Sequence, residues 1–259
     1  IPARMESSRL PNKLIADIEG KTMLQRVIEK CKKVNSISNI FLCTDNLTLK
    51  KIADDLEIET ILTSKSCESG SHRISTVIEC LMEHTWDIKL KNTFKDITDL
   101  LKKTVIINVQ ADQPFLNPNI ISEMIEFFKN SNSSLEVVTP IYKLKEKSIH
   151  NPNVVKTLLN QNKEAIYFSR TALPYIRDLE KNLWYQKHDY WGHAGIYGFR
   201  ADTLLSWNKL EKSSLENAEK LEQLRLIDNG ISISTFKIDE ESLSIDTMEQ
   251  LIEARELAK

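Results

Sequence analysis

The chain has 259 residues, of which 41% are hydrophobic and 28% are charged. This composition is typical of a folded globular protein with a sizeable core, and it excludes a largely disordered chain. Lysine and arginine number 35 against 37 aspartates and glutamates, so the formal net charge is −2. Proteins that coat nucleic acid usually carry a basic excess, so the charge argues against nucleic acid as a partner. The length favours one large domain, or a core with an appended lobe.

The cysteines and the hydropathy pattern indicate the cellular location of the protein. Four cysteines occur without a CxxC pair or a histidine spacing that would complete a zinc site, which indicates reduced, buried thiols. No run of eighteen apolar residues and no signal peptide is visible, so we expect a cytoplasmic protein with no membrane partner. Because the chain opens on Ile1 without a methionine, we expect that a few residues have been trimmed from its start.

The first part of the chain alternates between helical and strand-like periodicity. Apolar residues recur at helical spacing over residues 23–31, 49–56, 74–81 and 120–128. Short apolar runs predict strands over residues 40–43, 59–63 and 104–109. Alternation of this kind predicts βαβ units and therefore a parallel sheet with right-handed crossovers. The polar, lysine-rich stretch 83–103 is interpreted as a surface insertion.

The alternation of predicted helices and strands ends after Leu135. Four strands without long helices between them are predicted over residues 137–142, 154–159, 165–169 and 194–199. This indicates a mixed or antiparallel section that forms a lobe or a dimer surface. A helix over 214–228, a strand over 231–238 and a last helix from about 247 complete the chain. Since no Gly/Ser linker divides the sequence, we expect a single domain.

The opening loop carries a concentration of cations. Arg4, Arg9 and Lys13 would follow the first strand and precede the first helix, at the carboxyl end of the sheet, where open α/β sheets bind ligands. Three cations, two serines and free backbone N–H groups suit a triphosphate, although no Walker A motif is present. A solvated basic loop is the alternative, and charge alone favours it.

Two aspartates follow strand-like segments. Asp112 comes directly after the strand at 104–109, where a carboxylate is well sited to hold Mg²⁺, which usually binds one or two carboxylates and substrate phosphates. The alternative, a cap for the helix near Asn117, is disfavoured because that helix begins several residues later. Asp246 offers a second carboxylate, but local sequence favours its being the N-cap of the last helix.

Two further groups of residues are candidates for a binding site. Glycines flank His193, which suggests close approach of a ligand or of another backbone, and His193 shares strand parity with Tyr197. A lone histidine is more often structural. Tyr167–Arg170 precede this segment, and Glu222–Arg225 lie within the helix predicted at 214–228, where a solvated helix face is the alternative.

Taken in order, these segments resemble the CMP-Kdo synthetases, the 3-deoxy-manno-octulosonate cytidylyltransferases. The opening matches the pattern IPARxxSxRLPxK, and residues 20–23 match GKPM except at Thr22. The remaining matches are Ala53, Asp54, Ser69, Gly70, Arg73, residues 108–110, Pro114, residues 151–153, residues 167–170, His193, residues 195–198, residues 221–225, Asp246 and Thr247. Each piece is weak by itself, but the combination covers nearly the whole chain and is specific.

The resemblance implies an α/β nucleotide-binding core with a mostly parallel sheet flanked by helices, over about 1–135 and 200–259, with an inserted mixed dimerisation lobe at about 136–199. It implies transfer of CMP from CTP to the anomeric hydroxyl of Kdo, release of pyrophosphate and a homodimer. The implied catalytic residues are Lys13, Asp112 and Asp246, the two aspartates holding Mg²⁺ as cofactor. The implied nucleotide-binding residues are Ala3, Arg4, Arg9, Lys13, Ser71, Arg73 and Gln110. The implied sugar-binding residues are Gln110, Arg170, His193, Tyr197, Glu222 and Gln223.

The chain also departs from the family pattern. Ser71 and His72 stand where the family commonly has threonine and an acidic residue, and Ala111 and Gln113 stand where it usually reads QGDEP. The usual LEHIE appears as Leu215 to Glu219 with Asn217 and Ala218 inside it. We therefore hypothesise a variant acceptor, such as the 8-amino analogue of Kdo. The alternatives are a sialic-acid-type cytidylyltransferase, whose opening pattern fits less well at Ser8–Pro11, and a non-catalytic nucleotide-binding relative.

Overall fold

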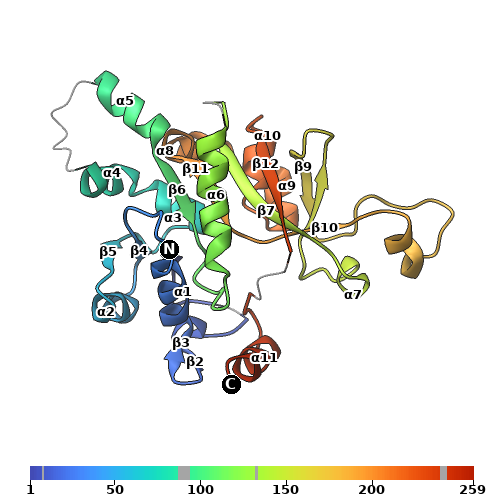
Figure 1. Cartoon of the computed structure of the whole chain (residues 1–259), viewed down its shortest axis with the longest axis horizontal. Coiled ribbons are helices and arrows are strands. Elements are labelled where there is room, and N and C mark those ends of the chain that lie inside the picture. The colour runs from blue at the N-terminus through green and yellow to red at the C-terminus, as the bar shows by residue number, and fades with distance from the viewer. Residues whose placement is uncertain (8, 87–93, 132–133, 240–243) are drawn as a thin grey trace.

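The computed structural model describes residues 1–7, 9–86, 94–131, 134–239 and 244–259 (Figure 1). A three-stranded parallel sheet has the order β1 (Pro2–Ala3), β4 (Phe41–Thr44), β5 (Glu59–Leu62). Its connections are helical, as the predicted βαβ alternation requires: α1 (Met23–Lys32) leads into β4, and α2 (Leu47–Asp55) leads into β5. The opening strand is therefore the first strand of a parallel sheet, and the cationic loop follows it.

A second, seven-stranded sheet is mixed. Its order is β6 (Val105–Asn108), β11 (Tyr197–Arg200), β7 (Val137–Lys143), β10 (Trp191–His193), β8 (Lys156–Leu159), β9 (Ala165–Ser169). These neighbours pair antiparallel, whereas β12 (Ile233–Ile238) pairs in parallel with β7. The strands between 136 and 199 thus continue the sheet that contains β6. The division into a core and an inserted dimerisation lobe stays a prediction.

The remaining elements surround these sheets. They are β2 (Asp17–Ile18), β3 (Lys21–Thr22), α3 (Gly70–Ser75), α4 (Ile78–Trp86), α5 (Phe94–Lys103), α6 (Pro118–Asn130), α7 (Glu146–Ile149), α8 (Ala201–Leu205), α9 (Ser214–Glu219), α10 (Leu224–Asp228) and α11 (Met248–Leu257), with 3₁₀ turns at Lys13–Ile15, Lys181–Gln186 and Ser206–Lys209. Figure 1 shows α6 lying across β6 and β7, and a long arm reaching beyond β10. In the described part of the chain no helix is long and apolar enough to cross a membrane.

Local sequence explains where the helices begin and which face they bury. Thr22 accepts the N–H of Gln25, and the Gln25 side chain accepts the N–H of Thr22, which together form a capping box that starts α1. The five apolar residues at helical spacing on α1 are all buried against the core. Asn117 caps α6, and Pro118 occupies its first turn, where a missing N–H is harmless. The periodicity therefore predicted both helices correctly.

Several elements differ from their predictions. The strand predicted at 104–109, β6, lies in the mixed sheet beside antiparallel β11 and not in the parallel sheet. The helix predicted at 214–228 is two helices, α9 and α10, because Lys220 adopts a left-handed φ of 55° after α9 and ends it. The helix at 74–81 is likewise divided between α3 and α4. The strand at 194–199 begins only at Tyr197, since Gly195 turns the chain with a φ of 75° between β10 and β11. Of the predicted insertion, 87–93 lies outside the described residues, and the parts on either side are helical, ending α4 and forming α5.

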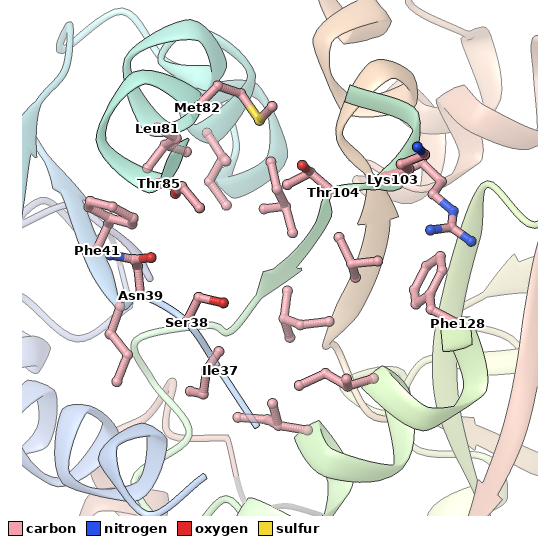
Figure 2. A pocket seen from close by; sticks show the side chains of 18 of the residues that line it. Ile37, Ser38, Asn39, Phe41, Leu81, Met82, Thr85, Lys103, Thr104 and Phe128 are labelled. Carbon is pink, nitrogen blue, oxygen red and sulfur yellow. The ribbon is translucent and has the colours of Figure 1, made fainter. Parts of the chain in front are cut away.

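A cavity of about 780 Å³ lies between the two sheets. Figure 2 shows Ile37, Ser38, Asn39 and Phe41 on one side of it, α4 above, and Phe128 on the other side. Strand β6 forms part of its wall, with Val105, Ile106 and Ile107 in the lining. No residue that the sequence assigned to substrate or metal lines this cavity. The predicted site lies elsewhere.

Candidate functional site

A second cavity, of about 290 Å³, opens where β1 and β6 end. Its wall includes eight of the residues that the family resemblance assigned to the site: Ala3, Arg4, Arg9, Lys13, Arg73, Gln110, Asp112 and Asp246. Carboxyl ends of strands in an open α/β sheet commonly form such a site. The fold therefore brings together side chains that are up to 243 positions apart, since Ala3 and Asp246 share one wall (246 minus 3).

Lys13 joins the two aspartates. Its Nζ lies 2.7 Å from Asp112 Oδ2 and 2.8 Å from Asp246 Oδ1, and it also donates to the carbonyl of Ile245 at 3.2 Å. Arg9 Nη2 lies 2.8 Å from the other oxygen of Asp246. Burial disfavours the charged form of Asp246, but the cations of Lys13 and Arg9 outweigh it and lower its pKa. Burial also opposes the charge on Lys13, but its two carboxylate partners raise its pKa overall.

Neither aspartate caps a helix. Thr247 caps α11 with a capping box to Gln250, so the local preference for Asp246 as the N-cap was wrong. Asn117 caps α6. This confirms the prediction that Asp112, several residues before that helix, is not its cap. The backbone N–H of Ile245 donates to the carbonyl of Asp112 at 3.0 Å, which fixes the loop after β6 to the segment before α11. Both carboxylates are thus held at the cavity by backbone contacts and are available for a cation.

The donor set fits Mg²⁺. Two hard carboxylate oxygens, one from each aspartate, converge within 2.8 Å of a single positive atom, the Lys13 ammonium nitrogen, which marks a cation position. Magnesium usually takes one or two carboxylates and draws its other ligands from phosphate and water. No group of three or more His, Cys, Asp or Glu that could hold a metal occurs among the described residues.

Arg73 lies deeper than the opening loop. It is only 3% exposed, and its guanidinium donates to Thr63 Oγ1 and lies 3.4 Å from Asp45 Oδ2. The sequence analysis missed Asp45. Its position directly after β4 is the same strand-end signal that identified Asp112. This buried ion pair fixes Arg73 at the cavity wall, whereas Arg9 is 54% exposed and can follow a ligand.

Ser71 and Glu222 form a second polar group behind the cavity wall. The Ser71 hydroxyl donates to Glu222 Oε1 at 3.0 Å, its N–H donates to Oε2 at 3.1 Å, and Asn108 donates to the same hydroxyl at 3.1 Å. Burial raises the pKa of Glu222 despite the hydrogen bonds from Ser69 and Ser71. Burial and the nearby Glu222 carboxylate raise the pKa of Tyr197 well above its ordinary value. Gln110 donates to Asn108 at 3.3 Å and connects this group with the cavity.

His193 is a neutral, internally bonded histidine. Thr139 Oγ1 donates to the carbonyl of Ile196 at 2.7 Å, so it accepts from His193 Nε2, 2.9 Å away. Burial lowers the pKa of His193 to about 3. Its ring centroid lies 5.0 Å from that of Tyr197. The two residues do not share a strand, contrary to the parity argument, but the turn between β10 and β11 still brings their rings together.

Arg170 is held by Glu219 and Pro152, for which the sequence predicted no role. Its backbone N–H donates to Glu219 Oε2 at 2.9 Å, its Nε donates to the Glu219 carbonyl at 2.8 Å, and its Nη1 donates to the Pro152 carbonyl at 3.1 Å. Lys156, the buried first residue of β8, donates to the carbonyl of Arg170. Burial lowers the pKa of Lys156 to about 8. The guanidinium of Arg170 is therefore held in one orientation, and its Nη2 has no hydrogen-bond partner among the described residues.

Of the predicted sugar-binding residues, Gln110 lines the 290 Å³ cavity and the other five do not. Arg170, His193, Tyr197, Glu222 and Gln223 all lie outside its wall, and Gln223 is buried. Glu222 also lies in the turn before α10, and not within a helix as predicted. Of the departures from the family pattern, Ala111 lines the cavity and Gln113 is buried next to Asp112, whereas Asn217 and Ala218 are exposed on α9.

Residues 1–233 match the family model described as cytidylyltransferase. The chain belongs to the cytidylyltransferase family. It is 34% identical to the 3-deoxy-manno-octulosonate cytidylyltransferase of Parabacteroides distasonis over 98% of this chain and 94% of the relative. It is 36% identical to the enzyme of the same name from Polynucleobacter necessarius over 99% of this chain and 93% of the relative.

Solved structures agree. A CMP:2-keto-3-deoxy-manno-octonic acid synthetase complexed with CTP matches with a TM-score of 0.82 and 31% identity, over 99% of this chain and 95% of that one. A cytidylyltransferase from Leptospira borgpetersenii matches with a TM-score of 0.57 at 14% identity, over 96% of this chain and 80% of that one, which shows the fold alone. The resemblance to the CMP-Kdo synthetases and the predicted α/β fold class are confirmed, and this family is favoured over the sialic-acid-type alternative. The chain is a cytidylyltransferase enzyme and not a non-catalytic relative.

Proposed function

We propose that the protein joins CTP to the anomeric hydroxyl of a Kdo-type sugar acid and releases pyrophosphate. The observation that carries this proposal is the convergence of Lys13, Asp112 and Asp246 in a cavity whose wall also holds Arg4 and Arg9. A triphosphate binds cations and a metal binds carboxylates. This one cavity supplies both kinds of group. The relatives named 3-deoxy-manno-octulosonate cytidylyltransferase and the match to a synthetase complexed with CTP support both substrates.

The reaction displaces pyrophosphate from the α-phosphorus of CTP by a sugar hydroxyl. Such transfers depend on positioning and charge neutralisation more than on covalent catalysis. Arg4, Arg9 and Lys13 would neutralise the triphosphate and stabilise the charge that develops on the leaving pyrophosphate. Arg73, held by Asp45, would form a fixed wall for the cytidine side of the cavity, together with Ala3 and Gln110. No covalent enzyme intermediate is required.

Asp112 and Asp246 would hold Mg²⁺, and the Lys13 ammonium would then move from the carboxylates towards the phosphates. When bound, the ion would supply Lewis-acid polarisation of the phosphate oxygens. The ammonium nitrogen pairs with both carboxylates, and its charge, together with that of Arg9, lowers the pKa of Asp246.

The sugar acid would bind on the side formed by Arg170, His193, Tyr197, Glu222 and Gln223. The contacts to Glu219 and Pro152 leave Arg170 Nη2 for a carboxylate, which arginine can grip with two hydrogen bonds. We propose that the acceptor is a variant octulosonic acid such as 8-amino-Kdo, because Gln113 removes one negative charge from beside Asp112 and Ala111 changes the cavity wall. Ordinary Kdo is the competing acceptor.

We also propose a homodimer in the cytoplasm. Strand β9 is an edge of the seven-stranded sheet, Ile166 on it is 48% exposed, and the arm beyond it exposes Tyr175 and Tyr185. Exposed apolar side chains on a strand edge favour association with a second chain. Light scattering at micromolar concentration checks this, and a monomer would contradict it. The four free thiols suit the reducing cytoplasm, which also supplies CTP.

The test of the function is pyrophosphate release from CTP and Mg²⁺ with either Kdo or 8-amino-Kdo. Release that requires metal, sugar and Asp112 supports the proposed reaction, and a higher kcat/KM for the 8-amino sugar supports the variant acceptor. Clear preference for Kdo contradicts only the proposal of a variant acceptor and leaves the proposed reaction unchanged. No release with either sugar, from folded protein, contradicts the proposed acceptor class.

A further inference from the structure

Gln113 joins two loops that belong to opposite sides of the proposed active site. Its side chain is 3% exposed, and its Nε2 donates to the backbone carbonyl of Ala194 at 2.7 Å. Ala194 follows His193 in the turn between β10 and β11, and Gln113 follows Asp112 in the loop after β6. The hydrogen bond therefore spans 81 positions in sequence and connects the loop of a proposed metal ligand with the loop of a proposed sugar ligand.

The surrounding contacts make this connection rigid on both sides. Next to Gln113, the carbonyl of Asp112 accepts the N–H of Ile245 at 3.0 Å, so the loop after β6 is bound to the segment of Asp246. On the other side, the N–H of Ala194 donates to the Pro140 carbonyl at 3.2 Å, which fixes the turn to β7. Gln113 is the side chain that ties these two fixed segments together.

The bond requires an amide at this position. The Ala194 carbonyl is an acceptor, and a buried carboxylate in place of the amide would set two acceptors against each other. There is little room to avoid this, because a Cβ added to Gly195 would already come within 3.1 Å of Gln113 Nε2. The glutamate usual in the family pattern could not make this contact in its ionised form. The contact is thus a property of this chain's own sequence.

The other end of the amide is unusual. Gln113 Oε1 is buried and has no hydrogen-bond partner among the described residues. A buried polar atom without a partner destabilises the fold, and few occur in folded proteins. An apolar side chain of the same length would avoid that cost. The hydrogen bond that its Nε2 donates to the Ala194 carbonyl offsets part of that cost.

Building on the proposed function, we infer that Gln113 is a positioning residue that sets the sugar-binding turn, with His193 and Tyr197, relative to the carboxylates at the metal position. It acts through the Ala194 carbonyl and touches neither substrate nor metal. Its loss is expected to impair sugar binding more than nucleotide binding, because the residues lining the nucleotide cavity are held by contacts that do not involve Ala194.

The experiment compares Gln113→Met and Gln113→Glu with the wild type. Methionine has a similar length and removes both the bond and the unpartnered oxygen, so the variant is expected to fold. Two measurements are made: KM for the sugar and for CTP, and hydrogen–deuterium exchange of peptides covering residues 190–198. Gln25→Met is the matched control. It also removes an amide, but the hydrogen bond that this side chain accepts, from the Thr22 N–H, lies within the capping box of α1.

The sugar KM of Gln113→Met is expected to rise about tenfold, and that of Gln113→Glu more, with the CTP KM within about twofold of wild type. Exchange across 190–198 is expected to accelerate in both variants and not in the control. Equal rises in both KM values, or unchanged exchange in Gln113→Met, would overturn the inference. Exchange needs no turnover, so it tests the link between the loops even if neither sugar proves to be the substrate.

Discussion

The two sides of the proposed active site are built on different principles. At the phosphate side the contacts are between ions: Lys13, Arg9, Asp112 and Asp246 form one network, with side chains 13–54% exposed. At the acceptor side the contacts join side chains to backbone carbonyls and hydroxyls, and His193 is held neutral. At the first side opposite charges pair with one another, whereas at the second the charged groups of Arg170 and Glu222 are hydrogen-bonded to neutral groups.

This difference determines how each side responds to substitution. Removing a charge from the phosphate side leaves its partner unbalanced, so the effects should follow electrostatics and depend on metal. Removing a contact from the acceptor side shifts a loop or a guanidinium, so the effects should follow geometry and concern the sugar. The predictions below test that contrast, beginning with the largest expected effect.

Asp112→Asn should have the largest effect. It removes one of the two carboxylates at the cation position and leaves Lys13 with Asp246 alone, so kcat is expected to fall about 10³-fold, the upper range for loss of one preorganised electrostatic group. Pyrophosphate release measures it. Asp55→Asn, on the exposed face of α2, is the control and should retain full activity. Activity within a few-fold of wild type would show that Asp112 is not a metal ligand.

Lys13→Met separates two roles of one ammonium group. Turnover is expected to fall about 10²-fold because charge on the leaving pyrophosphate loses a partner. Binding of Mn²⁺ without nucleotide, measured by electron paramagnetic resonance, should instead become about tenfold tighter, since no ammonium competes for the two carboxylates. Lys21→Met, which breaks the exposed pair with Glu29, is the control. Weaker Mn²⁺ binding in Lys13→Met would contradict the placement of the ion between the carboxylates.

Glu219→Gln tests the acceptor side. Its carboxylate accepts from the Ser169 hydroxyl at 2.6 Å and from the Arg170 N–H at 2.9 Å, and the amide can retain only one of these as an acceptor. The sugar KM is expected to rise about threefold, with metal dependence unchanged, because the backbone of Arg170 loses a hydrogen bond while its guanidinium keeps the carbonyls of Glu219 and Pro152. Glu126→Gln on the exposed side of α6 is the control. An altered metal requirement would show that the two sides are not separate.

The acceptor side should also carry an acid sensitivity of its own. His193 has a folded pKa of about 3 against an ordinary value of 6.5, so between these pH values the unfolded chain binds a proton that the folded chain does not. Stability is therefore lost as pH falls below 6.5, by up to about 1.4 kcal/mol per pH unit. Urea unfolding at pH 7, 6 and 5 measures this slope. His193→Gln should flatten it, whereas His188→Gln, at an exposed position, should not.

The phosphate side was the more predictable of the two from sequence. Asp112 was identified because it follows a strand-like segment, and open α/β sheets bind ligands where their strands end. Asp246 also follows a strand, but local sequence favoured it as a helix cap, and the fold brings its carboxylate to Lys13. The α1 and α6 helices were predicted for a similar reason, since their caps and apolar faces are local in sequence. The cations of the opening loop, Arg4, Arg9 and Lys13, were also identified from the sequence, the family resemblance added Arg73, and all four line the cavity.

The acceptor side could not be predicted in this way. Its contacts join Gln113 to Ala194 and Glu219 to Arg170, over 81 and 49 positions, and no local pattern indicates such pairs. The break between α9 and α10 depends on a left-handed Lys220, which apolar periodicity does not register. Tertiary contacts, and not local propensity, form this side.

The smallest effect is expected for His72→Asp, which restores the acidic residue usual in the family. His72 lies in the first turn of α3, where its Nδ1 accepts the N–H of Glu68 at 3.2 Å, and it does not line the 290 Å³ cavity. An aspartate can accept the same hydrogen bond and is favoured near a helix N-terminus, so stability should change by no more than about 1 kcal/mol. The ratio of kcat/KM for Kdo and 8-amino-Kdo should stay within about twofold, since a larger change needs contact with the acceptor. A tenfold change in that ratio would place acceptor selection at α3 instead of at the loop of Ala111 and Gln113.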